Sequence, residues 1–192
     1  FSTARWIQAT DPLGGTERLE SWIIHDNDAN TPFSAPPNTV PVGFETNNKH
    51  LDESMTFYWD KRAMLVAPGD ITQARQTHWA VTQGFNRMVP AKRAEKMPLE
   101  NRVWYTYPGS VDRAHLGNDS LPIAVGRVLD DGTSQTWQYT NNAAGMMTKM
   151  VDPTGRETVY VYGTGGTPDA DPITGTGSDL LEVKQKSGGV YD

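Results

Sequence analysis

The chain of 192 residues contains no cysteine. This absence excludes disulfide scaffolds, thiolate zinc sites, iron–sulfur clusters and thiol nucleophiles. No apolar run approaches the ~18 residues that a membrane-spanning helix needs, so we expect no membrane span. Lys and Arg number 17 against 23 Asp and Glu, which gives a net charge of −6. That balance argues against nucleic acid as a partner, because surfaces that bind phosphates over a wide area are basic.

Helical periodicity is nearly absent as well. The best helical candidate is the run Ala91–Lys96, bounded by Pro90 and Pro98, which has room for a turn or two. Short β-rich runs separated by Gly, Pro, Asn and Asp clusters make up most of the chain. No long helix is available to cross between parallel strands. The pattern therefore predicts an all-β fold, built as an antiparallel hairpin meander.

Three regions show this pattern with different clarity. Residues 1–54 hold two short apolar runs and a proline-rich stretch, which predict a loosely organised N-terminal segment with a loop along the surface. Residues 55–122 contain strand-like runs and predict a β-rich region. Residues 123–192 carry the sharpest hairpin signals, with a Gly-rich insertion at 163–178. We expect the chain to be a segment of a longer protein.

Two turn signals define the hairpins of the last region. The β-rich runs Ile123–Leu129 and Thr133–Tyr139 flank Asp130-Asp131-Gly132, and glycine supplies the positive φ that such turns need. Asp152-Pro153-Thr154-Gly155 separates the next two β-rich runs and has Pro preset at its second position. Both signals predict tight turns between neighbouring antiparallel strands.

The strand ends at Tyr139, Tyr162 and Tyr191 resemble one another, and such self-similarity indicates stacked hairpins that support each other sideways. The stretch Tyr139–Tyr162 resembles the RHS or YD repeat of bacterial proteins, in which Tyr-Asp, turn residues, Gly and a strand precede Asp-Pro-x-Gly-Arg and a strand ending in Tyr. The residues that fit the repeat are Tyr139, Gly145, Asp152, Pro153, Gly155, Arg156 and Tyr162, with Tyr191 and Asp192 as a later Tyr-Asp pair. YWDKRA from Tyr58, ENRVWYTYPG from Glu100 and VGRVLDDG from Val125 are also similar to large bacterial RHS proteins.

The resemblance implies a long antiparallel sheet that spirals into a shell or an extended β assembly. It implies a non-enzymatic structural segment of an exported protein at the cell surface or outside the cell. The implied partners are neighbouring repeats or further copies of the chain, joined through β-edges, and an effector domain or a surface glycan. The shell would enclose an effector that lies outside this chain.

No catalytic, cofactor or metal site stands out in the sequence. The four histidines, His25, His50, His78 and His115, show no metal-ligand spacing. Carboxylate pairs are too numerous for sequence to single one out. We therefore predict no catalytic residue, no cofactor and no metal, and assign structural or surface roles to the histidines.

The aromatic residues have two interpretations. They can pack between neighbouring hairpins, as the core of a repeat protein requires, or stand on an exposed face and stack against sugar rings. We favour packing because they occur at strand positions. The alternative is a glycan-binding β-domain, whose candidate stacking residues are Trp59, Trp79, Trp104 and Tyr107.

Overall fold

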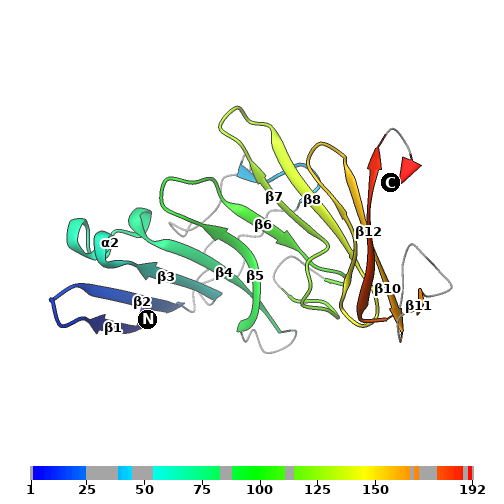
Figure 1. Cartoon of the computed structure of the whole chain (residues 1–192). Helices are drawn as coiled ribbons and strands as arrows, with labels where there is room; N and C mark the ends of the chain where they lie inside the picture. Colours follow the sequence, from blue (N-terminus) through cyan, green and yellow to red (C-terminus); the bar gives the residue numbers. More distant parts are fainter. Residues whose placement is uncertain are drawn as a thin grey trace.

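The structure is a computed structural model that describes residues 2–24, 39–44, 54–82, 88–110, 115–164, 167–168, 177–187 and 190–191. The described strands form one antiparallel sheet that runs across the molecule from the N-terminal to the C-terminal end (Figure 1). In these residues no helix is long and apolar enough to cross a bilayer.

The strands are distributed along the whole described part of the chain. The N-terminal half contains β1 (Ser2–Thr10), β2 (Thr16–Ile24), β3 (Met55–Trp59), β4 (Arg75–Val81), β5 (Met88–Lys96) and β6 (Val103–Thr106). The C-terminal half contains β7 (Ala124–Val128), β8 (Ser134–Asn141), β9 (Met147–Val151), β10 (Glu157–Thr164), β11 (Thr167–Pro168), β12 (Asp179–Ser187) and β13 (Val190–Tyr191). The helical elements are α2 (Lys61–Val66) and the 3-10 turn η2 (Ile71–Gln73).

The order of strands in the sheet is the order along the chain, from β1 to β10 and on to β12 and β13, with β11 paired beside β10. Each strand pair is antiparallel. The predicted all-β antiparallel meander is therefore confirmed. Such a topology needs only hairpin connections, which the Gly, Pro and Asp clusters of the sequence provide.

One face of the sheet, here named the covered face, carries the main core. Met55, Phe57 and Trp59 alternate along β3 with half-buried residues, and their side chains pack against Ala63 of α2 and Ala74. Asp60 caps α2, since its carboxylate accepts a hydrogen bond from the Ala63 N–H at 2.8 Å. The alternation thus places one full set of β3 side chains beneath the helix.

Farther along the sheet, residues 39–44 lie on the same covered face. The Trp104 indole donates to the Thr39 carbonyl oxygen at 2.8 Å, and the Val42 N–H donates to Ser134 Oγ at 3.0 Å. Phe44 packs on the Ala94–Trp104 cluster, and its ring lies where a side chain at Gly126 would stand. This part of the proline-rich stretch packs on the covered face of the sheet, and Pro41 is fully buried there.

The sequence-based helix at Ala91–Lys96 is wrong, because these residues belong to strand β5. Lys96 and Glu95 pair with β4, and Ala94 lies between His78 and Trp104 in neighbouring strands. Helix propensity favours a run such as AKRAEK in isolation. Two flanking strands and the burial of Ala94 outweigh that preference.

The N-terminal region is also better ordered than its sequence suggests. β1 and β2 form a nine-residue hairpin in continuous register, from Ser2 opposite Ile24 to Thr10 opposite Thr16. Loose organisation is therefore wrong for residues 2–24. Residues 25–38 lie outside the described residues, as does most of the predicted insertion at 163–178.

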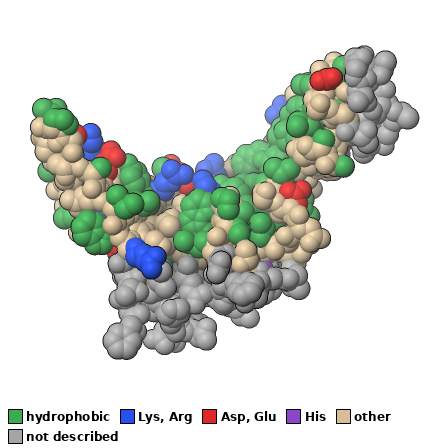
Figure 2. Space-filling model, turned by 90° about the horizontal axis from the view of Figure 1, so that it is seen from below, with side chains coloured by type: hydrophobic (Ala, Val, Ile, Leu, Met, Phe, Trp, Pro, Cys, Tyr) green, Lys and Arg blue, Asp and Glu red, His purple; other side chains and the backbone are tan. Residues whose placement is uncertain are grey.

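The sheet bends into an arch whose hollow side carries hydrophobic side chains together with Lys and Arg (Figure 2). Its register shifts within three strand pairs, β4–β5, β8–β9 and β10–β12. Bulges of this kind increase the local twist and bend a strand. Because all thirteen strands of the described residues share one sheet, these local bends add up over its width.

We expect Gly126→Ala to destabilise the protein by about 1–3 kcal/mol, the usual cost of overpacking. A Cβ at this position would lie 3.0 Å from the Gln135 carbonyl oxygen and 3.0 Å from the Phe44 ring. Thermal unfolding measures the loss. In a Phe44→Ala background the cost of Gly126→Ala should be smaller, and an equal cost in both backgrounds would contradict the packing of residue 44 on this glycine.

Candidate functional site

A five-residue turn recurs at four places in the described part of the chain: 11–15, 129–133, 142–146 and 152–156. In each, the first N–H donates to the carbonyl oxygen of the fifth residue, and the fourth N–H donates back to the first carbonyl. The fourth residue is always glycine with φ between 80° and 87°: Gly14, Gly132, Gly145 and Gly155. The positive φ explains why glycine stands there.

The side chain of the first residue completes three of these turns. Oδ1 of Asp152 accepts from the N–H groups of Thr154 and Arg156, at 2.8 and 3.0 Å. Asp11 and Asn142 make the same two contacts, with the second and fourth residues after them. The other carboxylate oxygen of Asp152, Oδ2, forms an ion pair with the Arg156 guanidinium at 2.9 Å. Two residues of the predicted repeat motif, Asp152 and Arg156, are therefore in direct contact.

These hydrogen bonds lower the pKa of Asp152 to about 2 from its ordinary value of 3.8. The Thr154 hydroxyl contributes most, and slight burial, which acts in the opposite direction, is outweighed by the N–H groups and Arg156. The carboxylate is therefore part of the fold of this hairpin.

The predicted repeat tyrosines take positions in the sheet. Tyr162 is buried in β10 and Tyr139 is half-buried in β8. Tyr191 belongs to the short strand β13, and Asp192 lies outside the described residues. The structure thus places the motif residues from Asp152 to Arg156 at the turn between β9 and β10. Tyr162 lies on β10, and Tyr139 lies on β8, the strand next to β9.

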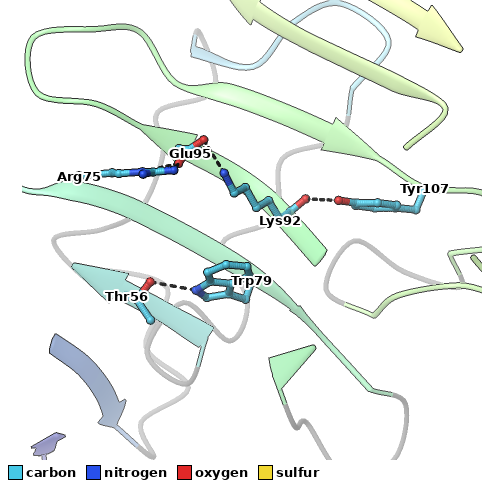
Figure 3. A network of polar contacts seen from close by, with 6 residues as sticks. All are labelled: Thr56, Arg75, Trp79, Lys92, Glu95 and Tyr107. Atoms are coloured by element: carbon cyan, nitrogen blue, oxygen red, sulfur yellow. Dashed lines mark hydrogen bonds and ion pairs between the residues drawn. The ribbon is translucent and has the colours of Figure 1, made fainter. Parts of the chain in front are cut away.

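Three of the four residues proposed for glycan stacking are wrong for that role, because they are buried. Trp59 and Trp104 donate their indole N–H to backbone carbonyl oxygens at 2.8 Å, and the Tyr107 hydroxyl donates to the Lys92 carbonyl oxygen at 2.7 Å. Burial raises the pKa of Tyr107 to about 12. Trp79 is half-buried and donates to Thr56 Oγ1 at 2.9 Å (Figure 3).

Trp79 lies on the face of the sheet opposite to Met55, Phe57 and Trp59, here named the open face. The centre of this face holds an ion-pair network in which Glu95 joins Arg75 of β4 to Lys92 of β5 (Figure 3). Partial burial of Glu95 opposes its ionisation, but the hydrogen bonds and charges of Lys92 and Arg75 outweigh this and lower its pKa.

Beside this network the open face carries a band of half-buried aromatic and aliphatic residues. Tyr105, Val125 and Trp137 are direct cross-strand partners on β6, β7 and β8. Tyr139 lies opposite Met150 on β9 in the same way. Burial raises the pKa of both tyrosines above the ordinary value of 10. Cross-strand alignment therefore makes one surface from residues that lie far apart in the sequence.

Two of the four histidines lie in the described residues, and they stand in different elements. His78 is buried in β4 and His115 forms an isolated bridge with Val81, while His25 and His50 lie outside the described residues. Within the described ranges no three His, Asp or Glu residues lie close enough to hold a metal ion.

No family model matches the chain, and no curated protein matches it.

Sequence reasoning missed the first of the four turns, although a signal was present. Asp11-Pro12-Leu13-Gly14 has the same Asp-Pro-x-Gly pattern as residues 152–155. Reading the two together would have predicted the β1–β2 hairpin. The aromatic band on the open face had no such signal, since it depends on the register between strands.

We expect the stability of the 152–156 hairpin to fall as pH drops from about 4 to about 2, because the pKa of Asp152 is lowered to about 2 in the folded protein. A carboxyl with a lowered folded pKa stabilises the fold above its unfolded value and loses that contribution on protonation. Asp152→Asn keeps the Oδ1 acceptor, as Asn142 does in its own turn, but cannot titrate.

The measurement is thermal unfolding of both proteins across this pH range. The unmodified chain should lose more of its Tm than Asp152→Asn does. If the Tm of the two proteins falls equally with pH, the Asp152 carboxylate does not contribute to the pH dependence of stability. Asp11→Asn is a companion test, because the Asp11 carboxylate forms its ion pair with Lys61 of α2, whereas Asp152 forms its ion pair with Arg156 of the same turn. The Lys61 hydrogen bond lowers the pKa of Asp11 as well, so this variant should also weaken the loss of Tm at low pH.

Proposed function

We propose that this chain is a structural, non-enzymatic segment of an exported bacterial RHS/YD-repeat protein, outside the cell or on its surface. Its strands would form part of the wall of a β-shell or of a larger β assembly. The observation that carries the proposal is the recurrence of one five-residue turn at four hairpins, three of them consecutive. Recurrent supersecondary units in which each contacts its neighbours are the mark of repeat architectures.

The layout of the sheet supports the same function. Each strand pairs with its neighbours in the chain, so a hairpin added at either end would extend the sheet without disturbing the rest. Helix α2 and residues 39–44 lie on the covered face. A wall of this kind has one face packed by its own chain and another turned towards what the assembly contains, which would be an effector outside this chain.

The first test is the association state of the isolated chain. A wall segment with two sheet edges should associate with itself, because its outer strands present backbone donors and acceptors. Light scattering over a wide concentration range should show a mass that rises with concentration, and electron microscopy should show ribbons or sheets. A stable monomer at every concentration would contradict the proposal.

A second candidate function, glycan binding, is favoured by the band of half-buried aromatics on the open face. Tyr105 on β6 and Trp137 and Tyr139 on β8 flank Val125 of β7 on this face. Arg75 and Lys92, which pair with Glu95, lie on the same face in β4 and β5. Aromatic faces beside polar groups are suited to sugar rings. This surface replaces the buried residues of the sequence-based candidate set.

Tryptophan fluorescence titrated with oligosaccharides of several classes tests this candidate. Binding should be lost in Trp137→Ala and kept in Trp6→Ala, since Trp6 is 57% exposed on the covered face. No response to any sugar class in the unmodified protein would exclude the open face as a glycan site. Loss of binding in both variants would show that the effect is not specific to that face.

A further inference from the structure

The outer edge of β1 lacks the features that protect sheet edges. In the described residues only β2 pairs with β1, and their nine-residue register contains no bulge. The strand has no proline or lysine, and its one charged residue is Arg5. Edge strands that do not pair with another chain are usually short, contain a β-bulge, or carry lysine or proline. At the opposite end of the sheet, the two-residue strand β13 pairs only with Lys186 and Ser187 of β12, and β12 is charged by comparison, with Asp179, Glu182, Lys184 and Lys186.

The direction of the backbone groups on β1 follows from its turn. The Asp11 N–H donates to the Gly15 carbonyl oxygen, so residue 11 points towards β2. Because alternate residues of an antiparallel strand point to opposite sides, Ile7 also points towards β2, and Trp6 and Gln8 point away from it. A second strand would therefore bond to Trp6, Gln8 and the other even-numbered residues.

We infer that β1 pairs antiparallel with β1 of a second copy of this chain, with the two Ile7 residues opposite each other on the two-fold axis. This inference rests on the proposed function, in which the sheet edges pair with other strands. It specifies β1 as the edge and a second copy of the chain as the partner. Ile7 is 73% exposed in the single chain, and the pairing covers it with its own counterpart. A two-fold contact of this kind is closed, because each copy uses the same surface.

Charge complementarity selects this register. With Ile7 on the axis, Arg5 faces Ala9 of the second copy, and Ala9 pairs in turn with Glu17 on β2. All three residues are on the same face of the sheet. The Cα atoms of Arg5 and the second copy's Glu17 are then two strand spacings apart, about 10 Å, which the two long side chains can span over the alanine methyl group.

The neighbouring register is less favourable. If Trp6 lay on the axis, Arg5 would face Ile7 of the second copy, and the two Arg5 side chains would be near diagonal neighbours. Like charges at that spacing repel one another. The register centred on Ile7 separates the arginines and places each one near Glu17 of the other copy, whose carboxylate also accepts a hydrogen bond from the Tyr58 hydroxyl in its own chain.

Single cysteine substitutions test the register. The chain has no cysteine of its own, so no other disulfide can form. Opposed residues of a non-hydrogen-bonded pair lie about 4.5 Å apart in Cα, within disulfide reach, so Ile7→Cys should form a disulfide-linked dimer on mild oxidation. Trp6→Cys should not, since its counterpart would be beyond about 7 Å. Cross-linking of Trp6→Cys but not of Ile7→Cys would overturn the register.

A charge exchange tests the contact between Arg5 and Glu17. Arg5→Glu and Glu17→Arg should each weaken self-association, by about tenfold, because each homodimer then contains two like-charged contacts. An equal mixture of the two variants should associate as a heterodimer, since both contacts are then oppositely charged. Failure of the mixture to associate better than either variant alone would overturn the pairing.

A proline variant separates this inference from the proposed function. Gln8→Pro removes an N–H that points away from β2, so it should leave the β1–β2 hairpin folded and abolish the dimer, whereas Gln8→Ala should keep it. Circular dichroism checks the fold. A Gln8→Pro chain that dimerises unchanged overturns the pairing through β1. Loss of the β1 dimer with continued association through the opposite edge, formed by β12 and β13, would leave the proposed function standing. Monomers in every variant and in the unmodified chain would overturn both.

Discussion

A single antiparallel sheet with two faces and two edges is the constraint on which the rest of this structure depends. Hydrophobic stabilisation requires apolar surface to be removed from water, and one sheet alone buries little of it. The chain meets this requirement on one side, where Phe57 and Trp59 lie beneath α2 and Trp104 lies beneath residues 39–44. The half-buried state of Trp137 on the open face and the exposure of Ile7 on β1 follow from the same arrangement.

The turns are what make so wide a sheet attainable from one short chain. A hairpin whose turn is fixed by its own first side chain and by a glycine forms without help from distant residues. Asp152 does this with Thr154 and Arg156, and Asp11 does it with the backbone after it. Local turns of this kind set the register of the flanking strands, which in turn decides which side chains share a face.

Much of the C-terminal half could be predicted from the sequence because its signals are local. The β-rich stretch before Asp152 and the one after Gly155 are strands β9 and β10, and the turn between them adopts the positive φ expected of its glycine. The strand at Ala91–Lys96 could not be predicted, since its stability comes from β4 and β6 rather than from its own residues. The open face could not be predicted either, because Tyr105 and Trp137 meet only through the register of β7.

The bend of the sheet limits what can happen at its edges. Strands twist in one sense, and the bulges between β4 and β5, within β8–β9 and at Val161/Tyr162 add to that twist at fixed places. A strand added beside β1 would continue the curvature that β1 and β2 already have, since it would pair along the whole length of the edge. Growth at this edge therefore widens the arch and leaves the open face uncovered. Covering that face requires something other than another strand of the same sheet.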